Sequence, residues 1–144
     1  MAVTETKTKT TIHVETMVKA SQEKVWKYWN EPTHITKWCY ASDDWHAPHA
    51  ENDLRVNGKF STTMAAKDGS MSFDFWGIYN VVEPYETIEY TLGDGRKVMI
   101  TFSNNGKETK IRETFEAEHE NSIEMQKNGW QAILDNFKKY TEVN

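Results

Sequence analysis

The sequence contains little cysteine and proline and no long apolar segment. Its single cysteine, Cys39, cannot form an internal disulfide, and only three prolines interrupt the 144 residues. A chain of this length can bury a continuous core without covalent cross-links, so we expect a reducing, cytoplasmic location and interpret Cys39 as a structural thiol rather than a nucleophile. Because a signal peptide or a membrane span needs a sustained apolar run, we expect neither.

The sequence also contains fewer basic than acidic residues. The chain carries 17 Lys and Arg against 22 Asp and Glu, which gives a formal net charge of −5. Nucleic-acid binding depends largely on Lys and Arg side chains that neutralise phosphates. We therefore expect no nucleic-acid partner.

The motifs of several common enzyme classes are also missing. The sequence contains no GxSxG, no glycine loop that would hold a phosphate and no HExxH. The covalent, nucleotide-dependent and metallopeptidase reactions that use these motifs therefore have no visible support. We expect no cofactor and favour a protein that is not an enzyme, while catalysis without such motifs stays open.

One short segment combines side chains that can bind metals. It contains Asp43, Asp44, His46 and His49. Their spacing matches no recognised zinc pattern, so we interpret the segment as a solvated loop and expect no metal site.

The first part of the sequence predicts one strand followed by two helices. Apolar and polar residues alternate over Thr11–Val18, as in a half-buried strand. Ser21 can cap a helix that ends near Asn30, and Pro32 suits the first turn of a second short helix over 33–38.

The middle of the sequence predicts an antiparallel meander. Four Asn-Gly or Asp-Gly pairs, each suited to a tight turn, divide segments of alternating hydrophobicity. The strands that we expect between these turns and Pro84 span 51–56, 59–66, 71–82, 87–92, 97–103 and 109–116.

A long helix is expected at the end of the chain. Asn121 and Glu124 have the spacing of a capping box, and a stripe of apolar residues follows at helical period. Only a face of the sheet is large enough to bury this stripe. We predict a single α+β domain over residues 11–144, preceded by a flexible tail over residues 1–10.

Several segments together resemble a known family. They are Val25-Trp26, Glu31-Pro32 with Trp38, Asp53–Gly58, Phe75-Trp76-Gly77, Val82-Glu83-Pro84 and Gly129-Trp130. In this order they are similar to homologues of the activator of the heat-shock protein 90 ATPase, within the START-like (SRPBCC) superfamily, over nearly the whole chain. The resemblance implies a helix-grip fold, in which a curved antiparallel sheet surrounds the C-terminal helix and leaves an elongated cavity.

Two glycines bear on that cavity. Alternation places Gly77 on the inward face of its strand, where it would either let the helix or a ligand approach the backbone or mark a bulge. Gly129 lies inside the closing helix, where glycine costs about 1 kcal/mol relative to alanine. Open space beside Gly129 would account for its presence, although an aromatic stripe on a helix is otherwise typical of an ordinary core.

A ligand in the cavity would contact mainly aromatic and aliphatic side chains. The residues that we expect to bind it are Trp38, Trp45, Phe73, Phe75, Tyr79, Glu113, Trp130, Ile133, Leu134 and Phe137. Trp76 and Ile78 would face the opposite side of the sheet as an apolar patch suited to self-association as a homodimer, unless flanking segments cover them.

Glu113 is the one charged member of this set. If Ile111 and Phe115 point inward, the period of two carries Glu113 inward too, and Arg112 or Arg55 would be its partner. The alternative is a bulge that turns Glu113 to water.

The sequence therefore supports three functional hypotheses. The first is binding of a small hydrophobic or aromatic molecule between the sheet and the C-terminal helix. The second is a cyclase, isomerase or hydrolase-like enzyme that uses Glu113, with Tyr79, to move protons. The third, which the resemblance alone implies, is an interaction domain for a chaperone or stress-response partner.

Overall fold

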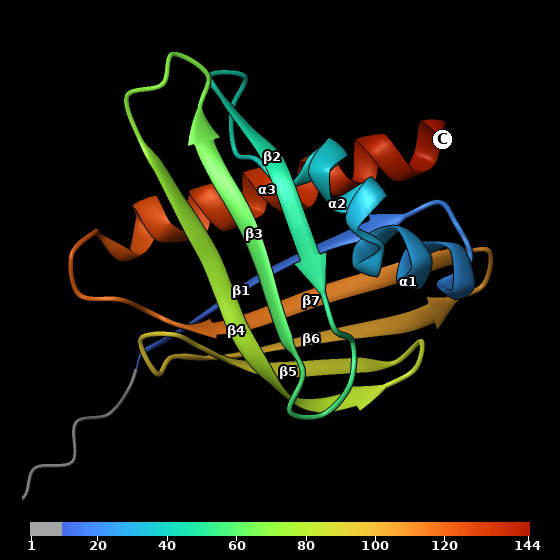
Figure 1. Ribbon diagram of the computed structural model, residues 1–144. Coiled ribbons are helices and arrows are strands. Elements are labelled where there is room, and N and C mark those ends of the chain that lie inside the picture. Colours follow the sequence, from blue (N-terminus) through green and yellow to red (C-terminus); the bar gives the residue numbers. More distant parts are fainter. Residues whose placement is uncertain (1–9) are drawn as a thin grey trace, which may run out of the picture.

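The computed structural model describes residues 10–144, in which seven antiparallel strands form one sheet that curls around a long C-terminal helix (Figure 1). The strand order is β1-β7-β6-β5-β4-β3-β2. The elements are β1 (Thr11–Val18), α1 (Gln22–Asn30), α2 (Pro32–Trp38), β2 (Trp45–Asn52), β3 (Lys59–Ala66), β4 (Ser72–Glu83), β5 (Thr87–Leu92), β6 (Lys97–Asn105), β7 (Glu108–Glu116) and α3 (Ile123–Val143). This architecture confirms the predicted α+β helix-grip fold. Residues 1–9 of the expected tail lie outside the described residues.

The predicted position of β2 is wrong. The strand begins at Trp45 and ends at Asn52, and the residues that follow form a turn. In this turn the Asp53 N–H donates to the Lys59 carbonyl at 3.0 Å, and the Gly58 N–H donates to the Arg55 carbonyl at 2.8 Å. The strand includes Pro48, whose nitrogen cannot donate to a neighbouring strand. It is tolerated because β2 lies at the edge of the sheet, where the pairing with β3 shifts register between His46 and His49.

The predicted cap of α3 is also wrong by one residue. The Ser122 hydroxyl, not Asn121, accepts the hydrogen bond from the Met125 N–H, at 3.1 Å. The Asn121 side chain instead donates to the Glu118 carboxylate at 2.9 Å, which closes the loop before the helix.

The second half of α3 is tied to the rest of the molecule by polar contacts. Lys138 Nζ donates to the Met17 carbonyl at 2.7 Å, and the Asn136 side chain donates to the carbonyls of Trp38 and Tyr40, each at 3.2 Å. Figure 1 shows this half beside α1 and α2, whereas the first half extends away from them. The helix is thus anchored at one end and spans the concave face of the sheet with the other.

Leu134 and Phe137 belong to the anchored half and are fully buried. The Phe137 ring meets Trp29 of α1 and Trp38 of α2 edge to face, each at a centroid distance of 4.9 Å. The two short helices therefore cover this part of the stripe. The expectation that these two side chains contact a ligand is wrong because they form core at the filled end of the molecule.

The space at Gly77 is taken by the protein itself. A Cβ atom there would lie 2.8 Å from the Thr91 carbonyl oxygen and 2.9 Å from the Phe60 ring. The glycine therefore admits Phe60 from the neighbouring strand, rather than α3 or a ligand. A register shift does occur nearby, between Tyr79 and Val81.

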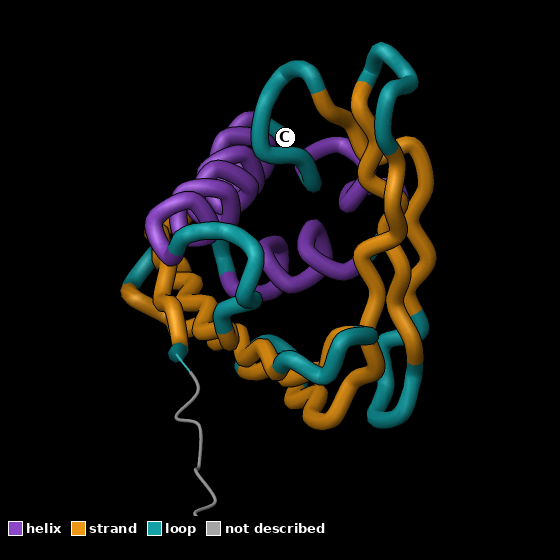
Figure 2. Tube along the Cα trace, turned by 90° about the vertical axis from the view of Figure 1, so that its left-hand side faces the viewer, coloured by secondary structure: helices purple, strands orange, loops and turns teal. Residues whose placement is uncertain are grey.

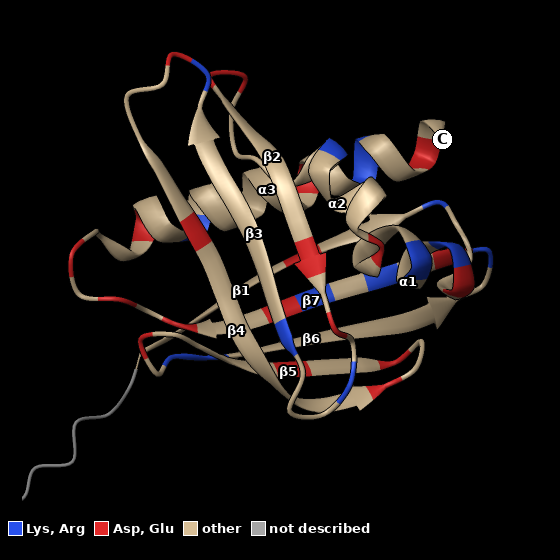
Figure 3. Cartoon of the chain, in the orientation of Figure 1, with Lys and Arg blue, Asp and Glu red and all other residues tan. Residues whose placement is uncertain are grey.

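Figure 3 shows Lys and Arg interspersed with Asp and Glu along the helices, strands and loops. Within residues 10–144, no helix is both long and apolar enough to cross a membrane.

Replacing Phe137 by alanine tests the anchor. We expect the free energy of unfolding to fall by about 3–5 kcal/mol, because the change leaves a void between two tryptophans. Urea unfolding measures it, with the exposed Lys139→Ala as the matched control on the same helix, expected within about 0.5 kcal/mol of the wild type. A loss below about 1 kcal/mol would show that this end of the helix is not tightly packed.

Candidate functional site

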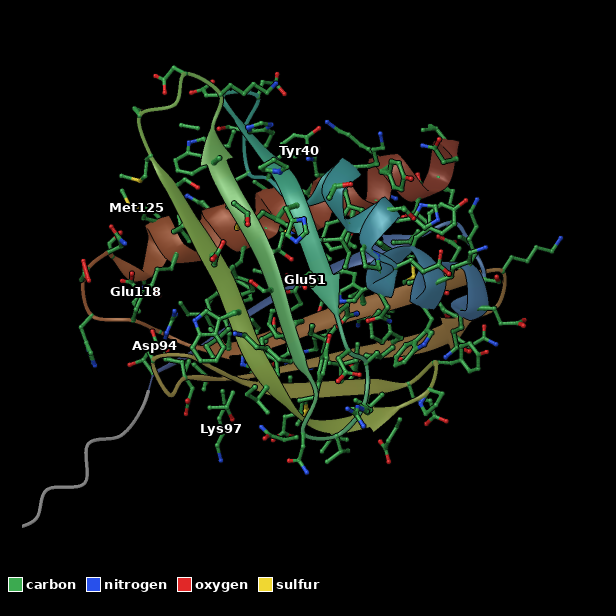
Figure 4. All side chains as sticks on the ribbon, in the orientation of Figure 1. Tyr40, Glu51, Asp94, Lys97, Glu118 and Met125 are labelled. Atoms are coloured by element: carbon green, nitrogen blue, oxygen red, sulfur yellow. The ribbon has the colours of Figure 1, made fainter. Side chains whose placement is uncertain are left out.

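A cavity of about 400 Å³ lies between the concave face of the sheet and the first half of α3. Figure 2, which views the molecule from the end where α3 begins, shows the backbone of the sheet curling past the helices. Exposed Phe73 and Asn121 belong to its lining together with the partly buried Glu118, so the cavity opens near the start of α3. Figure 4 places Glu118 and Met125 at this end of the molecule.

Aromatic side chains from both layers form most of the wall. From the sheet, Phe60 packs edge to face on Tyr90 at 4.6 Å, and Phe75 lies 5.9 Å from Trp130 of α3. Trp130 in turn stacks on Phe115 at 3.9 Å, with the two ring planes 12° apart. These contacts hold flat apolar surfaces around the cavity in fixed orientations.

Most of the residues expected at the site do line the cavity. They are Trp38, Phe73, Phe75, Tyr79, Glu113, Trp130 and Ile133. Trp45, the first residue of the edge strand β2, lies outside the lining, and its ring centroid is 6.0 Å from that of Phe73. Leu134 and Phe137 lie in the core as described above.

The sequence reasoning missed several lining residues that come from strands β3 and β5 and from α1. They include Trp29, Phe60, Thr62, Met64, Ile88 and Tyr90. Alternation within β3 and β5 was a usable signal, because Phe60, Thr62 and Met64 share one face, as do Ile88 and Tyr90. Trp29 gave no such signal, because its contact with the cavity depends on how α1 packs against the sheet.

Tyr79 is held in a polar chain at the wall. Its hydroxyl donates to Asn52 Oδ1 at 2.5 Å, and the Asn52 side chain donates to the Asn30 carbonyl at 2.8 Å. Burial raises the pKa of the Tyr79 hydroxyl well above its usual value. Tyr79 is therefore already hydrogen-bonded, which weakens its predicted role as a proton-transfer partner.

The rim of the cavity is also internally bonded. Gln126 is buried, and its amide donates to the carbonyls of Glu118 at 3.2 Å and Asn121 at 2.9 Å while its Oε1 accepts from the Glu118 N–H. Arg96 Nε donates to the Asp94 carboxylate at 2.8 Å. These groups stabilise the loops at the opening.

Glu113 points into the cavity, as the alternation of β7 predicted and contrary to the bulge alternative. Its exposed fraction is 5%, and its carboxyl group forms no hydrogen bond with any residue of the described range 10–144. Burial raises the pKa of this carboxyl group to about 8. At neutral pH it is therefore mainly protonated and can donate a hydrogen bond.

Neither predicted partner of Glu113 reaches it. Arg55 is exposed and pairs with Asp53 at 2.9 Å. Arg112 is also exposed, because adjacent residues of a strand point to opposite faces. The pairing prediction is wrong for this geometric reason.

Two other titratable groups lie near Glu113. Burial, followed by the charge of Glu113, raises the pKa of the Tyr90 hydroxyl well above its usual value. The same two causes raise the pKa of the Cys39 thiol to about 12. Cys39 is thus protonated at neutral pH, which fits a structural thiol rather than a nucleophile.

The Asp43–His49 segment does not gather into a ligand set. Among the residues that the structure describes, no group of three or more His, Cys, Asp or Glu side chains could hold a metal ion. His49 Nε2 instead lies 3.2 Å from the Glu51 carboxylate on the exposed edge strand.

Trp76 faces away from the cavity, as predicted. Its exposed fraction is 38%, since the ring packs against the backbone at Gly93 and the Lys59 ammonium lies 4.7 Å from the ring centroid. Flanking groups therefore cover part of this patch, and the homodimer remains a prediction.

Comparisons with known proteins agree with this architecture. The solution structure of an AHSA1-like protein from Aeromonas hydrophila is 42% identical, with a TM-score of 0.88 and 93% of each chain covered. A solution structure from Cytophaga hutchinsonii is 61% identical, with a TM-score of 0.80 and 92% of each chain covered. A crystal structure from Chromobacterium violaceum, at 23% identity and a TM-score of 0.83, covers 92% of this chain and 98% of its own and shares the fold.

The search of curated proteins gave no match. The family described as activator of Hsp90 ATPase homolog 1-like protein matches residues 19–142. Since this match spans most of the chain, the protein belongs to the activator of Hsp90 ATPase homolog 1-like family.

Proposed function

We propose that the cavity binds a small, largely apolar molecule. The observation that carries this proposal is the aromatic hollow of about 400 Å³ that α3 spans without filling. Small-molecule sites occupy roughly 300–1,000 Å³ and combine apolar walls with a few polar groups. Burial of apolar ligand surface, at about 25 cal/mol per Å², supplies the affinity.

Two features of the wall cost folding stability. Gly129 weakens the helix by about 1 kcal/mol relative to alanine, although, apart from its chain neighbours and the adjacent helix backbone, no described atom lies within 4 Å of the position that an alanine Cβ would occupy. Glu113 is buried without a hydrogen bond, which disfavours folding at any pH at which this carboxyl group is ionised in the unfolded chain. Costs of this kind are common where a protein keeps a site for function rather than for stability.

Filling the space beside Gly129 tests whether the cavity holds a ligand. We expect Gly129→Leu to weaken binding of a neutral apolar dye, aminoanthracene, by at least about tenfold, because the new side chain extends into the open space, while the melting temperature stays the same or rises. Quenching of tryptophan fluorescence measures binding, since Trp38 and Trp130 line the wall.

The matched control is Asn128→Leu, which adds the same side chain at the neighbouring exposed position of α3. It should leave the affinity for the dye unchanged. The proposed function would be refuted if the wild type and Gly129→Leu bound the dye with equal affinity. It would also be refuted if the wild type showed no saturable quenching and native mass spectrometry released no small molecule from the purified protein.

The cost of Glu113 predicts how stability depends on pH. The folded pKa of about 8 lies above the model value of 4.5, so below about pH 4.5 the carboxyl group is neutral in both states and has no effect. Between about pH 4.5 and pH 8 the Glu113 carboxyl group is ionised in the unfolded chain but still protonated in the folded protein, so the wild type loses stability as pH rises. At pH 7 we expect Glu113→Gln to be more stable by about 3 kcal/mol, with the difference constant above about pH 8.

Urea unfolding across this pH range measures the effect. Glu86→Gln, an exposed carboxylate before β5, is the control and should follow the wild-type curve. Parallel curves for Glu113→Gln and the wild type would contradict the burial of an unpartnered carboxyl group.

A further inference from the structure

Three buried polar side chains on the cavity wall have no hydrogen-bond partner in the described part of the chain, namely Thr62 of β3 together with Glu113 and Tyr90. Glu113 is 5% exposed and Tyr90 is 7% exposed, and both line the cavity. Their polar atoms remain accessible from the cavity, since among the described residues only the Thr141 hydroxyl is both sealed from solvent and unpaired. Buried polar groups are normally hydrogen-bonded, so two such groups facing one hollow indicate that a bound molecule supplies the missing partner.

The sheet brings the two groups to the same part of the concave floor. Glu113 of β7 pairs with Ile100 of β6, which pairs with Ile88 of β5. Tyr90 lies two residues after Ile88 and therefore on the same face. Burial and, after it, the charge of Glu113 raise the pKa of the Tyr90 hydroxyl, which agrees with this shared placement.

We propose that the ligand carries an oxygen atom, such as the carbonyl oxygen of a ketone, that accepts hydrogen bonds from both the Glu113 carboxyl group and the Tyr90 hydroxyl. This inference rests on the proposed function and adds the chemical class of the ligand. A carbonyl oxygen has two lone pairs and can satisfy both donors at once. An ammonium group has no lone pair and would leave the Tyr90 proton unpaired.

The titratable groups in and beside the cavity wall are consistent with an uncharged ligand. Cys39 after α2, Tyr79 of β4 and Tyr90 of β5 all have raised pKa values and are neutral at pH 7. The charged lining residues are Arg96, which pairs with Asp94, and Glu118, which bonds the loop N–H groups of Glu120 and Asn121. The lining residues of α1 and α3, including Trp29, Gln126 and Trp130, carry no titratable group.

A matched set of three tricyclic probes tests the inference. Fluorenone carries a carbonyl group, fluorene has a methylene group in its place, and the corresponding amine carries nitrogen on the same bridging carbon. Near pH 6 we expect the wild type to bind fluorenone about 10–100-fold more tightly than fluorene, because two buried donors gain a partner. Above about pH 8 this preference should fall by up to about tenfold as Glu113 ionises, and the share supplied by the Tyr90 hydroxyl should remain.

Conservative variants separate recognition from packing. Glu113→Gln keeps a donor and should retain the ketone preference but lose its pH dependence. Tyr90→Phe should lose about tenfold of the preference while binding fluorene as the wild type does. Circular dichroism and thermal unfolding establish that each variant is folded before binding is measured.

The outcomes distinguish this inference from the proposed function. Equal binding of fluorenone and fluorene overturns the inference and leaves the apolar cavity function standing. Tighter binding of the amine, increasing with pH, overturns it in favour of a carboxylate that binds cations. If none of the three probes binds, the inference fails, and the aminoanthracene titration on the same sample shows whether the proposed function fails with it.

Discussion

The contact on which the structure depends is the docking of the second half of α3 against α1, α2 and β1. Leu134 and Phe137 are fully buried there, and Lys138 and Asn136 bond to backbone carbonyls of the N-terminal third of the chain. This docking joins segments more than 90 residues apart. Because it fixes one end of the helix, the other end can lie over the curved sheet without packing tightly onto it. The filled core and the open cavity are thus two consequences of one helix position.

The alternation of hydrophobic residues predicted most of the sheet, since period two is a local property of each strand. The bounds of β1, β3 and β5 follow directly from it. β2 did not, because its residues, which include Pro48, form a strand only where the edge of the sheet tolerates a missing donor and a register shift. The cap of α3 was misplaced because both Asn121 and Ser122 have suitable side chains, and only the fold decides which of them the helix uses.

The site was less predictable than the fold, for a related reason. The stripe of α3 is continuous in sequence, yet Trp130 and Ile133 line the cavity whereas Leu134 and Phe137 are core. That division depends on where α1 and α2 stop covering the helix, and the apolar periodicity of α3 does not predict this position. The alternation of its neighbours on β7 predicted the direction of the Glu113 side chain. Its lack of an arginine partner could not be predicted, because it depends on where the fold places Arg55 and Arg112. Tyr90 was missed because its importance comes from being unpaired, and pairing is a property of the fold.

Gly129 and Glu113 both lower folding stability at the cavity wall, and these costs bear on what the cavity is for. Filling the hollow with larger side chains would add dispersion and hydrophobic contacts, and the open position at Gly129 shows that the helix has room for at least a methyl group there. A buried carboxyl group without a partner is costly in a sealed core, because nothing compensates its lost hydration. In a cavity with an opening, a ligand that fills the site can bond to the same group and offset part of this cost. The arrangement of Glu113, Tyr90 and Gly129 therefore supports the proposal that a bound molecule completes the wall, because folding alone does not require these costs.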